Sequence, residues 1–454
     1  MSALRTDLYQ LTMAAGYVRQ GLHRKRVSFE LFVRSLPESR RFLIFSGLHR
    51  IVQFLLELRF TDEDIDFLRE VPAIKPAWSP SFERHLRTFR FRGDVTAMAE
   101  GTPFFPGEPV LRVTGGLLEA QLVETFLLSV VNSESLVASK AARIRAASGD
   151  SKILEFGSRR TSPDEAVFSA RAAFIGGFDA TSNLEAGRRF GIPVEGTAAH
   201  SWVMAHRSER AAFKAFFEAY GEKAILLVDT YDTLGGVKTA LEVAGPRLGG
   251  VRLDSGDIES LSRAARAALD AAGAHQAIIV ASGDLNEHAI RDLRARGAPI
   301  DAWGVGTELV RSADAPHLSG VYKLVFDHDE DRPVLKLSSD KHTNPGAHQV
   351  LRFESDGFAV RDEVVLQGES SSGVGRPLLK PVLQQGELIE ALPDTHEVRA
   401  WARTQMELLP DSVRSLEPGP SGYEVVISPQ TRALRDLAEE ALRRSEVSLK
   451  GSAS

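Results

Sequence analysis

The feature that most constrains the fold is an alternation of short apolar runs with amphipathic segments, which begins near residue 150. The apolar runs have the length of strands and lie at residues 153–156, 193–196, 224–228, 250–253, 277–280 and 302–305. Between them are helical patterns such as SERAAFKAFFEAYG, which places its aromatic residues on one face and stops at a glycine. Strands that alternate with helices predict a parallel sheet with right-handed crossovers. The regular repeat favours an irregular, TIM-like α/β barrel, and an open doubly wound sheet is the alternative.

The regions on either side of this repeat have a different pattern. Before it, helices mix with strands, and the segment RVSFELFVRSL alternates in a way that predicts a half-buried strand. The basic run at residues 23–26 is most simply a solvated turn. We therefore predict an α/β protein with an N-terminal α+β domain over residues 1–130, the barrel over residues 131–330 and a C-terminal region over residues 331–454. The last part is expected to complete the N-terminal domain and to add terminal helices.

The composition excludes several classes of function. The chain has 454 residues, of which 43% are hydrophobic, and a formal net charge of −6, which speaks against a role on nucleic acid or on a membrane surface. It has no cysteine, which excludes disulfides and thiolate chemistry and fits a cytoplasmic location. The most apolar segment, residues 117–131, carries acidic side chains and is shorter than the ~20 residues that span a bilayer. We therefore expect no association with a membrane.

Ionisable side chains or glycines follow each of the predicted barrel strands. In chain order they are Gly157, Arg159 and Arg160; Thr197, His200 and Ser201; Asp229 and Asp232; Arg252, Asp254 and Asp257; Ser282, Gly283 and Asp284; and Gly304, Gly306 and Thr307. Because the carboxyl ends of the strands form the active site in α/β barrels, we expect these residues to share one pocket.

Each group has a simpler interpretation when it is taken alone. Paired arginines often bond surface carboxylates, a single histidine is more often structural than catalytic, and aspartates before helices are common N-caps. The GVGT segment resembles an ordinary turn, although it also suits a phosphate held by backbone amides. Taken together, the groups predict an enzyme that acts on a phosphorylated sugar or nucleotide. Asp254, Asp257 and Asp284 are the candidate ligands for Mg²⁺, which proteins bind through one or two carboxylates plus substrate phosphates.

A set of ordered motifs makes this prediction more specific. TDLYQLTM, EGTPFFPGEPVLRV, EFGSRR, GGFDATSN, GIPVEGTAAHSWV, VDTYDTLGGV, VRLDSGD and GVGTELV stand in the order seen in nicotinate phosphoribosyltransferases, and the chain resembles that family over essentially its whole length. The resemblance implies the type II phosphoribosyltransferase fold, assembled as a homodimer with shared active sites. It also implies a reaction of NAD biosynthesis and salvage, in which nicotinate and phosphoribosyl pyrophosphate give nicotinate mononucleotide and pyrophosphate. ATP hydrolysis is coupled to this reaction through a phosphohistidine, so that ATP and Mg²⁺ are the implied co-substrate and cofactor.

The resemblance also implies roles for individual residues in catalysis and in binding nicotinate. His200 would carry the phosphoryl group, Asp229 would hold its other ring nitrogen, and Asp254 would take part in catalysis. Thr197 and Arg252 match positions that contact nicotinate, and the charge of Arg252 would favour nicotinate over neutral nicotinamide.

The other residues that the resemblance implies bind the pyridine ring, the ribose and the phosphates. Phe156 would stack on the pyridine ring, Ser201 would lie on the pyridine side, and Tyr9 would reach the pocket from the partner subunit. The contacts to ribose, 5-phosphate and pyrophosphate would come from Arg159, Arg160, Asp179 of the GGFDATSN motif, Ser282, Gly283, Asp284, Gly304, Gly306 and Thr307.

Two segments depart from the pattern of the family. Residues 161–166 read TSPDEA where the family usually has a short loop with glutamine and glycine, and Glu165 would add negative charge near the phosphates. Ala347 and His348 stand where basic residues are usual. Two other functions are kept as alternatives: the related nicotinamide enzyme, and a catalytically silent barrel that binds nucleotide as a regulator or structural partner. The TSPDEA departure is the best support for the second.

Overall fold

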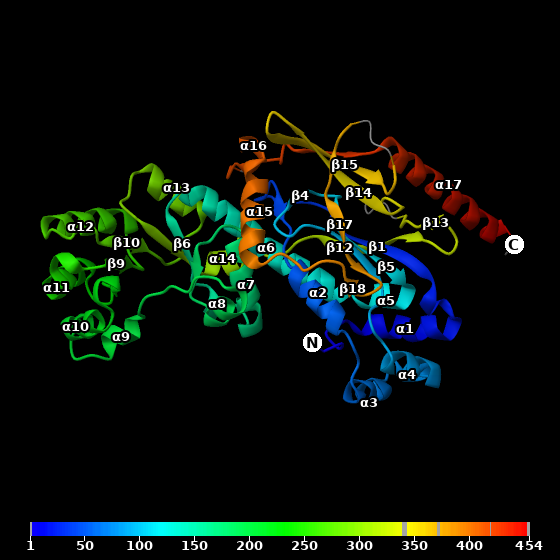
Figure 1. Ribbon diagram of the computed structural model, residues 1–454, viewed down its shortest axis with the longest axis horizontal. Coiled ribbons are helices and arrows are strands. Elements are labelled where there is room, and N and C mark those ends of the chain that lie inside the picture. The colour runs from blue at the N-terminus through cyan, green and yellow to red at the C-terminus, as the bar shows by residue number, and fades with distance from the viewer. Residues whose placement is uncertain (1, 338–342, 370–372, 418, 452–454) are drawn as a thin grey trace. The chain divides into compact units, whose positions relative to one another are not determined.

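The computed structural model describes residues 2–337, 343–369, 373–417 and 419–451. The chain divides into two compact units, which are coloured along the sequence in Figure 1. Unit 1 takes Met1–Ser135, His317–Pro393 and Thr404–Ser454, and unit 2 takes Leu136–Pro316 and Asp394–Arg403. Along the sequence, unit 2 is thus an insertion into unit 1.

Unit 1 is built on an antiparallel sheet of seven strands in the order β13-β12-β1-β5-β3-β17-β18. Their bounds are β1 Arg26–Val33, β3 Asp94–Met98, β5 Pro109–Gly116, β12 Gly320–Asp327, β13 Arg332–Pro333, β17 Leu379–Gln384 and β18 Glu387–Leu388. A second sheet has the order β16-β14-β15-β19, and β2 pairs with β4. The bounds of these strands are β2 Leu43–Ile44, β4 Pro103–Phe104, β14 His348–Ser355, β15 Phe358–Leu366, β16 Arg376–Pro377 and β19 Glu424–Ile427.

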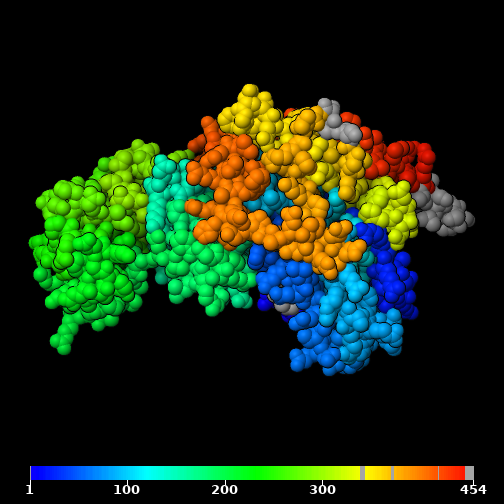
Figure 2. All heavy atoms as spheres, viewed as in Figure 1, coloured from blue at the N-terminus to red at the C-terminus, as the bar shows by residue number. Residues whose placement is uncertain are grey.

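Helices complete unit 1. They are α1 Leu8–Gln20, α2 Leu48–Glu57, α3 Asp62–Glu70, α4 Pro80–Arg87, α5 Leu117–Leu122, α16 Asp411–Arg414 and α17 Pro429–Gly451, while α6 Glu124–Ser148 and α15 Thr395–Glu407 contribute residues to both units. The segment that carries α3 and α4 lies at the surface of unit 1, where the space-filling view shows it in blue and light blue (Figure 2).

The strand β1 is buried on both faces rather than on one. Glu30 is only 3% exposed, and its carboxylate pairs with the backbone N–H and the ring Nδ1 of His348, at 2.7 and 2.8 Å. Arg112 lies 3.6 Å from the same carboxylate. A buried carboxylate needs such partners, because an unpaired charge in the interior is costly. The prediction of a half-buried strand is therefore wrong, and His348, one of the departures from the family pattern, is a core residue.

One helical span in the described part of the chain is long and apolar enough to cross a membrane. It joins α5 and α6, and 67% of its most apolar window is buried inside the protein. The expectation that this segment is too short to span a bilayer is therefore wrong. A single helix of this kind is nevertheless weak evidence for a membrane span, because a mostly buried core helix has the same length and composition.

Unit 2 contains a parallel sheet of six strands in the order β7-β6-β11-β10-β9-β8. Their bounds are β6 Lys152–Glu155, β7 Ala180–Thr181, β8 Ile225–Leu227, β9 Gly250–Leu253, β10 Ile278–Ala281 and β11 Ala302–Val305. The first strand along the chain, β6, pairs with the last, β11, which is the closure of a barrel; a doubly wound sheet would reverse its strand order instead. Over the residues that the structure describes, β7 and β8 do not pair with each other. The fold is the irregular, TIM-like barrel that the sequence predicts.

Residues 193–196, which we predicted as the second strand, do not form one. The second strand is β7, which has only two residues, and the later run contributes a single bridge between Thr181 and Val194. Pro193 has no N–H to give to a ladder, which explains why the pairing stops there.

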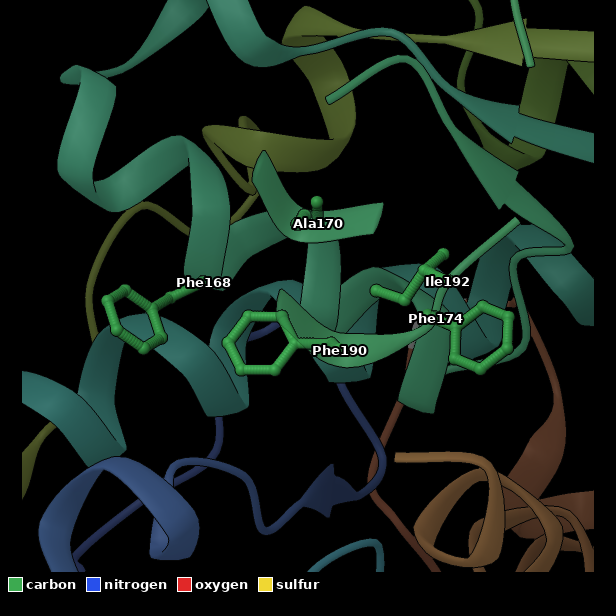
Figure 3. Close-up of a cluster of buried hydrophobic side chains, with 6 residues drawn as sticks. Phe168, Ala170, Phe174, Phe190 and Ile192 are labelled. Atoms are coloured by element: carbon green, nitrogen blue, oxygen red, sulfur yellow. The ribbon is translucent and has the colours of Figure 1, made fainter. Parts of the chain in front are cut away.

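Helices follow the strands of this sheet along the chain, and an apolar cluster joins two of them (Figure 3). They are α7 Pro163–Ile175, α8 Leu184–Phe190, α9 His200–Met204, α10 Glu209–Tyr220, α11 Thr233–Ala244, α12 Ile258–Ala271, α13 Glu287–Ala295 and α14 Thr307–Val310. Phe168 and Phe174 of α7 pack with Phe190 and Ile192 at the end of α8. This apolar contact fixes the two helices that follow β6 and β7.

Candidate active site

Arg252, on β9, is the centre of the polar groups at the carboxyl ends of the strands. Its guanidinium donates to Ser282 Oγ at 2.7 Å, Thr197 Oγ1 at 2.9 Å and Asp254 Oδ1 at 2.6 Å. The side chain is 14% exposed. A guanidinium has five N–H donors in a fixed fork, so two remain after these three bonds. The arrangement fixes the plane of the guanidinium and leaves part of it available to an anionic ligand.

Two carboxylates, those of Asp229 and Asp254, follow the neighbouring strands β8 and β9. Asp229 Oδ2 accepts the N–H of Asp254 at 3.0 Å, whereas its Oδ1 is buried and has no hydrogen-bond partner among the described residues. Burial raises the pKa of Asp254, but the hydrogen bond from Ser282 and the charge of Arg252 outweigh it and hold that pKa below its ordinary value. Both of these partners bond Oδ1 of Asp254. Each carboxylate thus keeps one oxygen that these bonds do not use.

His200 begins α9, and its side chain is 40% exposed. Its Nδ1 lies 3.2 Å from Thr230 Oγ1, while its Nε2 lies 4.0 Å from Asp229 Oδ1 and 3.8 Å from Asp254 Oδ2. Both distances to Nε2 exceed a hydrogen bond, so Asp229 does not hold the ring as the resemblance implied. Thr230 holds the ring instead, through Nδ1. We did not predict Thr230 from the sequence, although it directly follows Asp229.

The aromatic ring of Phe156 lies beside this polar group. A Cβ at position 304 on β11 would stand 2.6 Å from ring atoms of Phe156, so any larger residue there would have to displace the ring. On another side, the guanidinium carbon of Arg252 is 5.4 Å from the ring centroid. Gly283 is required for a different reason: its φ is +89°, and a Cβ would stand 2.3 Å from the carbonyl oxygen of Asp254. Both glycines allow the strand ends to approach closely.

Arg159 and Arg160 are exposed on a 3-10 turn, Ser158–Arg160, directly after β6. A carboxylate that we did not predict supports this turn. Glu155 is 1% exposed and accepts the N–H of Gly157 and the hydroxyl of Thr181. Burial raises the pKa of Glu155 despite these two bonds. The signal in the sequence is a glutamate inside the apolar run KILEF.

The segment after β11 also lies against β6. Thr307 begins α14, and a Cβ on Gly306 would stand 3.0 Å from the carbonyl oxygen of Phe156. The structure thus brings the ends of the first and last strands together, as the predicted pocket requires. Ser201, Gly283 and Asp284 are exposed at the same ends.

Asp179 has a different position from the one implied. It precedes β7, accepts the N–H of Ile153 at the beginning of β6 at 2.9 Å, and pairs with Arg145 and Arg399. It therefore lies at the amino ends of the strands, opposite the carboxyl ends, where its carboxylate joins β6 to two cations. The structure does not bring Asp179 into the substrate site.

The predicted metal ligands are not brought together either. Asp257 is the N-cap of α12, with its carboxylate bonded to the N–H and the hydroxyl of Ser260. Over the residues that the structure describes, no three His, Asp or Glu side chains form a group that could hold a metal ion. Asp254, Asp257 and Asp284 do not form such a set, because the carboxylate of Asp257 is bonded to Ser260 at the start of α12.

Tyr9 belongs to unit 1. It is 46% exposed on α1, and its hydroxyl lies 3.4 Å from Glu124 Oε2. Its role in the site of a partner subunit stays a prediction.

The unusual TSPDEA segment is the beginning of α7. Ser162 is the N-cap and accepts the N–H of Glu165 at 3.4 Å, Pro163 stands in the first turn, and Asp164 and Glu165 are the acidic residues of that turn. Serine, proline and acidic residues each stabilise a helix at these positions. The departure from the family pattern thus has a local structural reason.

Three protein-family models match the chain in sequence order. They describe the nicotinate phosphoribosyltransferase N-terminal domain at residues 4–132, the quinolinate phosphoribosyl transferase C-terminal domain at residues 137–315 and the nicotinate phosphoribosyltransferase C-terminal domain at residues 368–435. Over 446 residues the chain is 43% identical to nicotinate phosphoribosyltransferase pncB2 of Mycobacterium tuberculosis, with 96% of this chain and 94% of the relative covered. The chain belongs to the nicotinate phosphoribosyltransferase family.

Other nicotinate phosphoribosyltransferases are similar over the same extent. The enzyme of Bacillus subtilis is 40% identical over 460 residues, with 94% of this chain and 93% of the relative covered. The crystal structure of human nicotinic acid phosphoribosyltransferase superposes with a TM-score of 0.84 at 33% identity, covering 95% of this chain and 99% of that one. The expected family is confirmed, and the protein is an enzyme of this type rather than a silent barrel.

Proposed function

We propose that this enzyme joins nicotinate to phosphoribosyl pyrophosphate and couples the reaction to ATP hydrolysis through phosphorylation of His200. The products are nicotinate mononucleotide and pyrophosphate, as the salvage of nicotinate for NAD requires. The observation that supports this most is the setting of His200. One ring nitrogen bonds the hydroxyl of Thr230, and the other faces two carboxylates without a hydrogen bond to either.

The phosphoryl step uses the two ring nitrogens of His200 differently. When Nδ1–H donates to Thr230 Oγ1, Nε2 keeps its lone pair and is the nucleophile. Nε2 attacks the γ-phosphorus of ATP, and the bond to the oxygen of ADP breaks as the N–P bond forms. The ring then carries a positive charge, which Asp229 and Asp254 stabilise from 4.0 and 3.8 Å. Water later takes the phosphoryl group, releases a proton and restores the neutral ring.

The carboxylates of this site fit Mg²⁺ bound together with a substrate phosphate. Asp229 Oδ1 is buried without a hydrogen-bond partner in the described chain, and both bonds to the Asp254 carboxylate from Arg252 and Ser282 go to Oδ1. Mg²⁺ takes one or two carboxylate oxygens and fills its other positions with water and phosphate oxygens. When it is bound, the ion supplies charge neutralisation to the phosphates. Asp229 and Asp254 are thus the proposed ligands in place of Asp257.

Nicotinate is recognised by Arg252, Thr197 and Phe156. The two free donors of the guanidinium pair with the carboxylate of nicotinate, and the ring of Phe156 stacks on the pyridine. A charge-assisted hydrogen bond contributes roughly 1.5–3 kcal/mol, which favours nicotinate over nicotinamide by about one to two decades.

The transfer of the ribosyl group needs neutralisation of the leaving pyrophosphate more than it needs a strong base. Displacement at the anomeric carbon passes through a cationic sugar, and donors placed around the departing oxygens lower the barrier. Arg159 and Arg160 are the cations assigned to pyrophosphate. The groups assigned to the ribose and its 5-phosphate are Ser282, Gly283, Asp284, Gly304, Gly306 and Thr307.

The active form is proposed to be a cytoplasmic homodimer in which Tyr9 serves the site of the partner. The exposure of Tyr9 on α1 supports this role, since 46% of a large aromatic residue faces solvent. Mixing Tyr9→Ala chains with His200→Ala chains should restore part of the activity that each variant lacks. If the mixture is no more active than the two variants separately, each site is self-contained.

The proposed reaction is tested by assaying the purified enzyme with phosphoribosyl pyrophosphate, Mg²⁺ and either pyridine, with and without ATP. We expect mononucleotide from nicotinate about ten-fold or more faster than from nicotinamide, and a further increase with ATP. With γ-labelled ATP, the enzyme should become labelled, and His200→Ala should remove both the label and the effect of ATP while slow transfer persists.

The matched control is His206→Ala, which changes a nearby histidine whose ring bonds the carbonyl of Trp202. This variant should label normally. A preference for nicotinamide would overturn the substrate assignment, and label retained by His200→Ala would overturn the role of His200.

A further inference from the structure

A cavity in unit 1 has walls that the proposed reaction does not use. It has a volume of about 420 Å³ and lies where the turn after α1, the end of α4 and the loop before β3 meet the start of α5. Arg24, Arg90 and Arg92 line it, together with His23 and His85. None of these residues belongs to the barrel unit. The volume is in the range of sites for small ligands.

The positive charge of this cavity is poorly compensated. Over the described residues, none of the guanidinium groups of Arg24, Arg90 and Arg92 forms an ion pair with a carboxylate within 4 Å. The acidic residue in the wall is Glu119, whose Oε1 accepts the backbone N–H of Arg92 at 3.2 Å. Burial raises the pKa of Glu119, and this one carboxylate faces three arginines in the cavity wall. A protein with a net charge of −6 thus carries a local excess of cations.

Two histidines, His23 and His85, lie in the wall of this cavity beside the arginines. Their rings meet edge to face with centroids 5.2 Å apart. Burial lowers the pKa of His23, and the charge of Arg24 lowers it further. Burial also lowers the pKa of His85, with additional contributions from His23 and Arg24. Besides burial, the charge of Arg24 thus acts against protonation of both rings.

We propose that this cavity is a second binding site, for the polyphosphate group of a small molecule. Arginine forks match phosphate oxygens, and three exposed arginines from two separate segments of the chain line this one open cavity. Because an anion would raise the pKa of both histidines, binding should strengthen as the pH falls. The charged groups that line the cavity beside the histidines are Arg24, Arg90, Arg92 and Glu119. The arginines oppose protonation of the histidines, whereas the carboxylate of Glu119 favours it.

The site is tested by titration calorimetry on the full-length enzyme, with inorganic tripolyphosphate as the probe and ATP and adenosine as comparisons. We expect the Arg24→Gln/Arg92→Gln variant to lose one binding event per chain or to weaken it at least about ten-fold. Its KM for phosphoribosyl pyrophosphate and its unfolding temperature should stay near the wild-type values. The matched control is Arg19→Gln/Arg432→Gln, which removes two exposed arginines of unit 1 outside the cavity. This control should bind as the wild type does.

The outcomes separate the second site from the reaction site. Unchanged stoichiometry and affinity in the Arg24→Gln/Arg92→Gln variant would overturn the proposal. A rise in its KM for phosphoribosyl pyrophosphate equal to its loss of probe binding would also overturn it, because the cavity would then belong to the reaction. Binding of tripolyphosphate as tight as that of ATP would support recognition of the phosphates alone. Tighter binding of ATP than of tripolyphosphate would show that the nucleoside also contributes. Binding of adenosine alone would contradict a phosphate site.

Discussion

At Thr230 a single hydroxyl distinguishes the two ring nitrogens of His200. It lies 3.2 Å from Nδ1, and no side chain in the described chain holds Nε2 in the same way. A hydrogen bond of this kind contributes about 1 kcal/mol, mostly by fixing the ring. The residue therefore acts on His200 rather than on a substrate.

The Thr230→Val variant tests this positioning role. We expect phosphoenzyme formation from γ-labelled ATP to fall by roughly five- to ten-fold, because the hydroxyl that fixes the ring is lost. Transfer without ATP should change little. Thr230→Ser should restore labelling, which a role in packing would not predict. Equal labelling in all three proteins would show that the hydroxyl is dispensable.

Residue-scale prediction from the sequence succeeds where a motif fixes the position and fails where a side chain has more than one possible partner. Arg252 lies on β9 and Asp254 directly follows it, and His200 at the start of α9 lies 3.8 Å from the same aspartate. Asp257 stands in the same loop, but its spacing before a helix lets it cap α12. Asp179 was misplaced because a motif does not show at which end of a strand it lies.

At the scale of elements, the turn Ser158–Arg160 depends on the buried end of β6. Glu155 joins this turn to β7 through Gly157 and Thr181. Both partners donate to the carboxylate, so an amide in its place would direct an N–H group at one of two donors. The arginines of the turn would then lose their fixed position.

The Glu155→Gln variant should therefore raise the KM for phosphoribosyl pyrophosphate by about ten-fold while leaving the KM for nicotinate nearly unchanged. Steady-state kinetics with each substrate varied in turn will measure both constants. Glu195→Gln is a suitable control, because its carboxylate is half-exposed and pairs with Lys152 at the surface. An equal change in both constants would point to general loosening of the barrel.

A second prediction at this scale concerns the strand β11. Gly304→Ala places a methyl group against the ring of Phe156, and overpacking of this kind typically costs about 1–3 kcal/mol. We expect a lower unfolding temperature and a raised KM for nicotinate. Gly16→Ala is the control, since its Cβ would meet nothing within 4 Å. If both variants bind nicotinate equally well, the ring of Phe156 moves without consequence.

Elements with clear apolar runs could be predicted from the sequence, and very short ones could not. Strands β9 and β11 coincide with predicted runs. The two residues of β7 are too few to show any periodicity, whereas the longer run at residues 193–196 has the pattern of a strand without forming one. The burial of Glu30 in β1 was also hidden, because its partner His348 is distant in the sequence.

At the scale of the whole molecule, this buried pair makes stability depend on pH. Burial raises the pKa of Glu30, but the charge and hydrogen bonds of His348, together with Arg112, outweigh it and lower that pKa below its ordinary value of 4.5. The carboxylate therefore stabilises the fold fully above about pH 4.5, and this contribution is lost as the pH falls through the lower folded value.

We expect the free energy of unfolding to fall more steeply below about pH 4.5 in the wild type than in Glu30→Gln. Denaturant unfolding at a series of pH values will measure both curves. Glu38→Gln, which changes an exposed glutamate of the same unit, should follow the wild type. Parallel curves for the wild type and Glu30→Gln would contradict this contribution.

The insertion of the barrel into unit 1 determines the order in which the chain can fold during synthesis. Strand β1 obtains one neighbour from β5, but its other neighbour, β12, begins only at Gly320, after the whole barrel. Until the ribosome has made that residue, one edge of β1 stays open, and unpaired edges are prone to join other chains. A barrel that closes early, by pairing β6 with β11, shortens the effective loop between β1 and β12 and lowers its entropic cost. A destabilised barrel is therefore expected to reduce the yield of folded unit 1 as well.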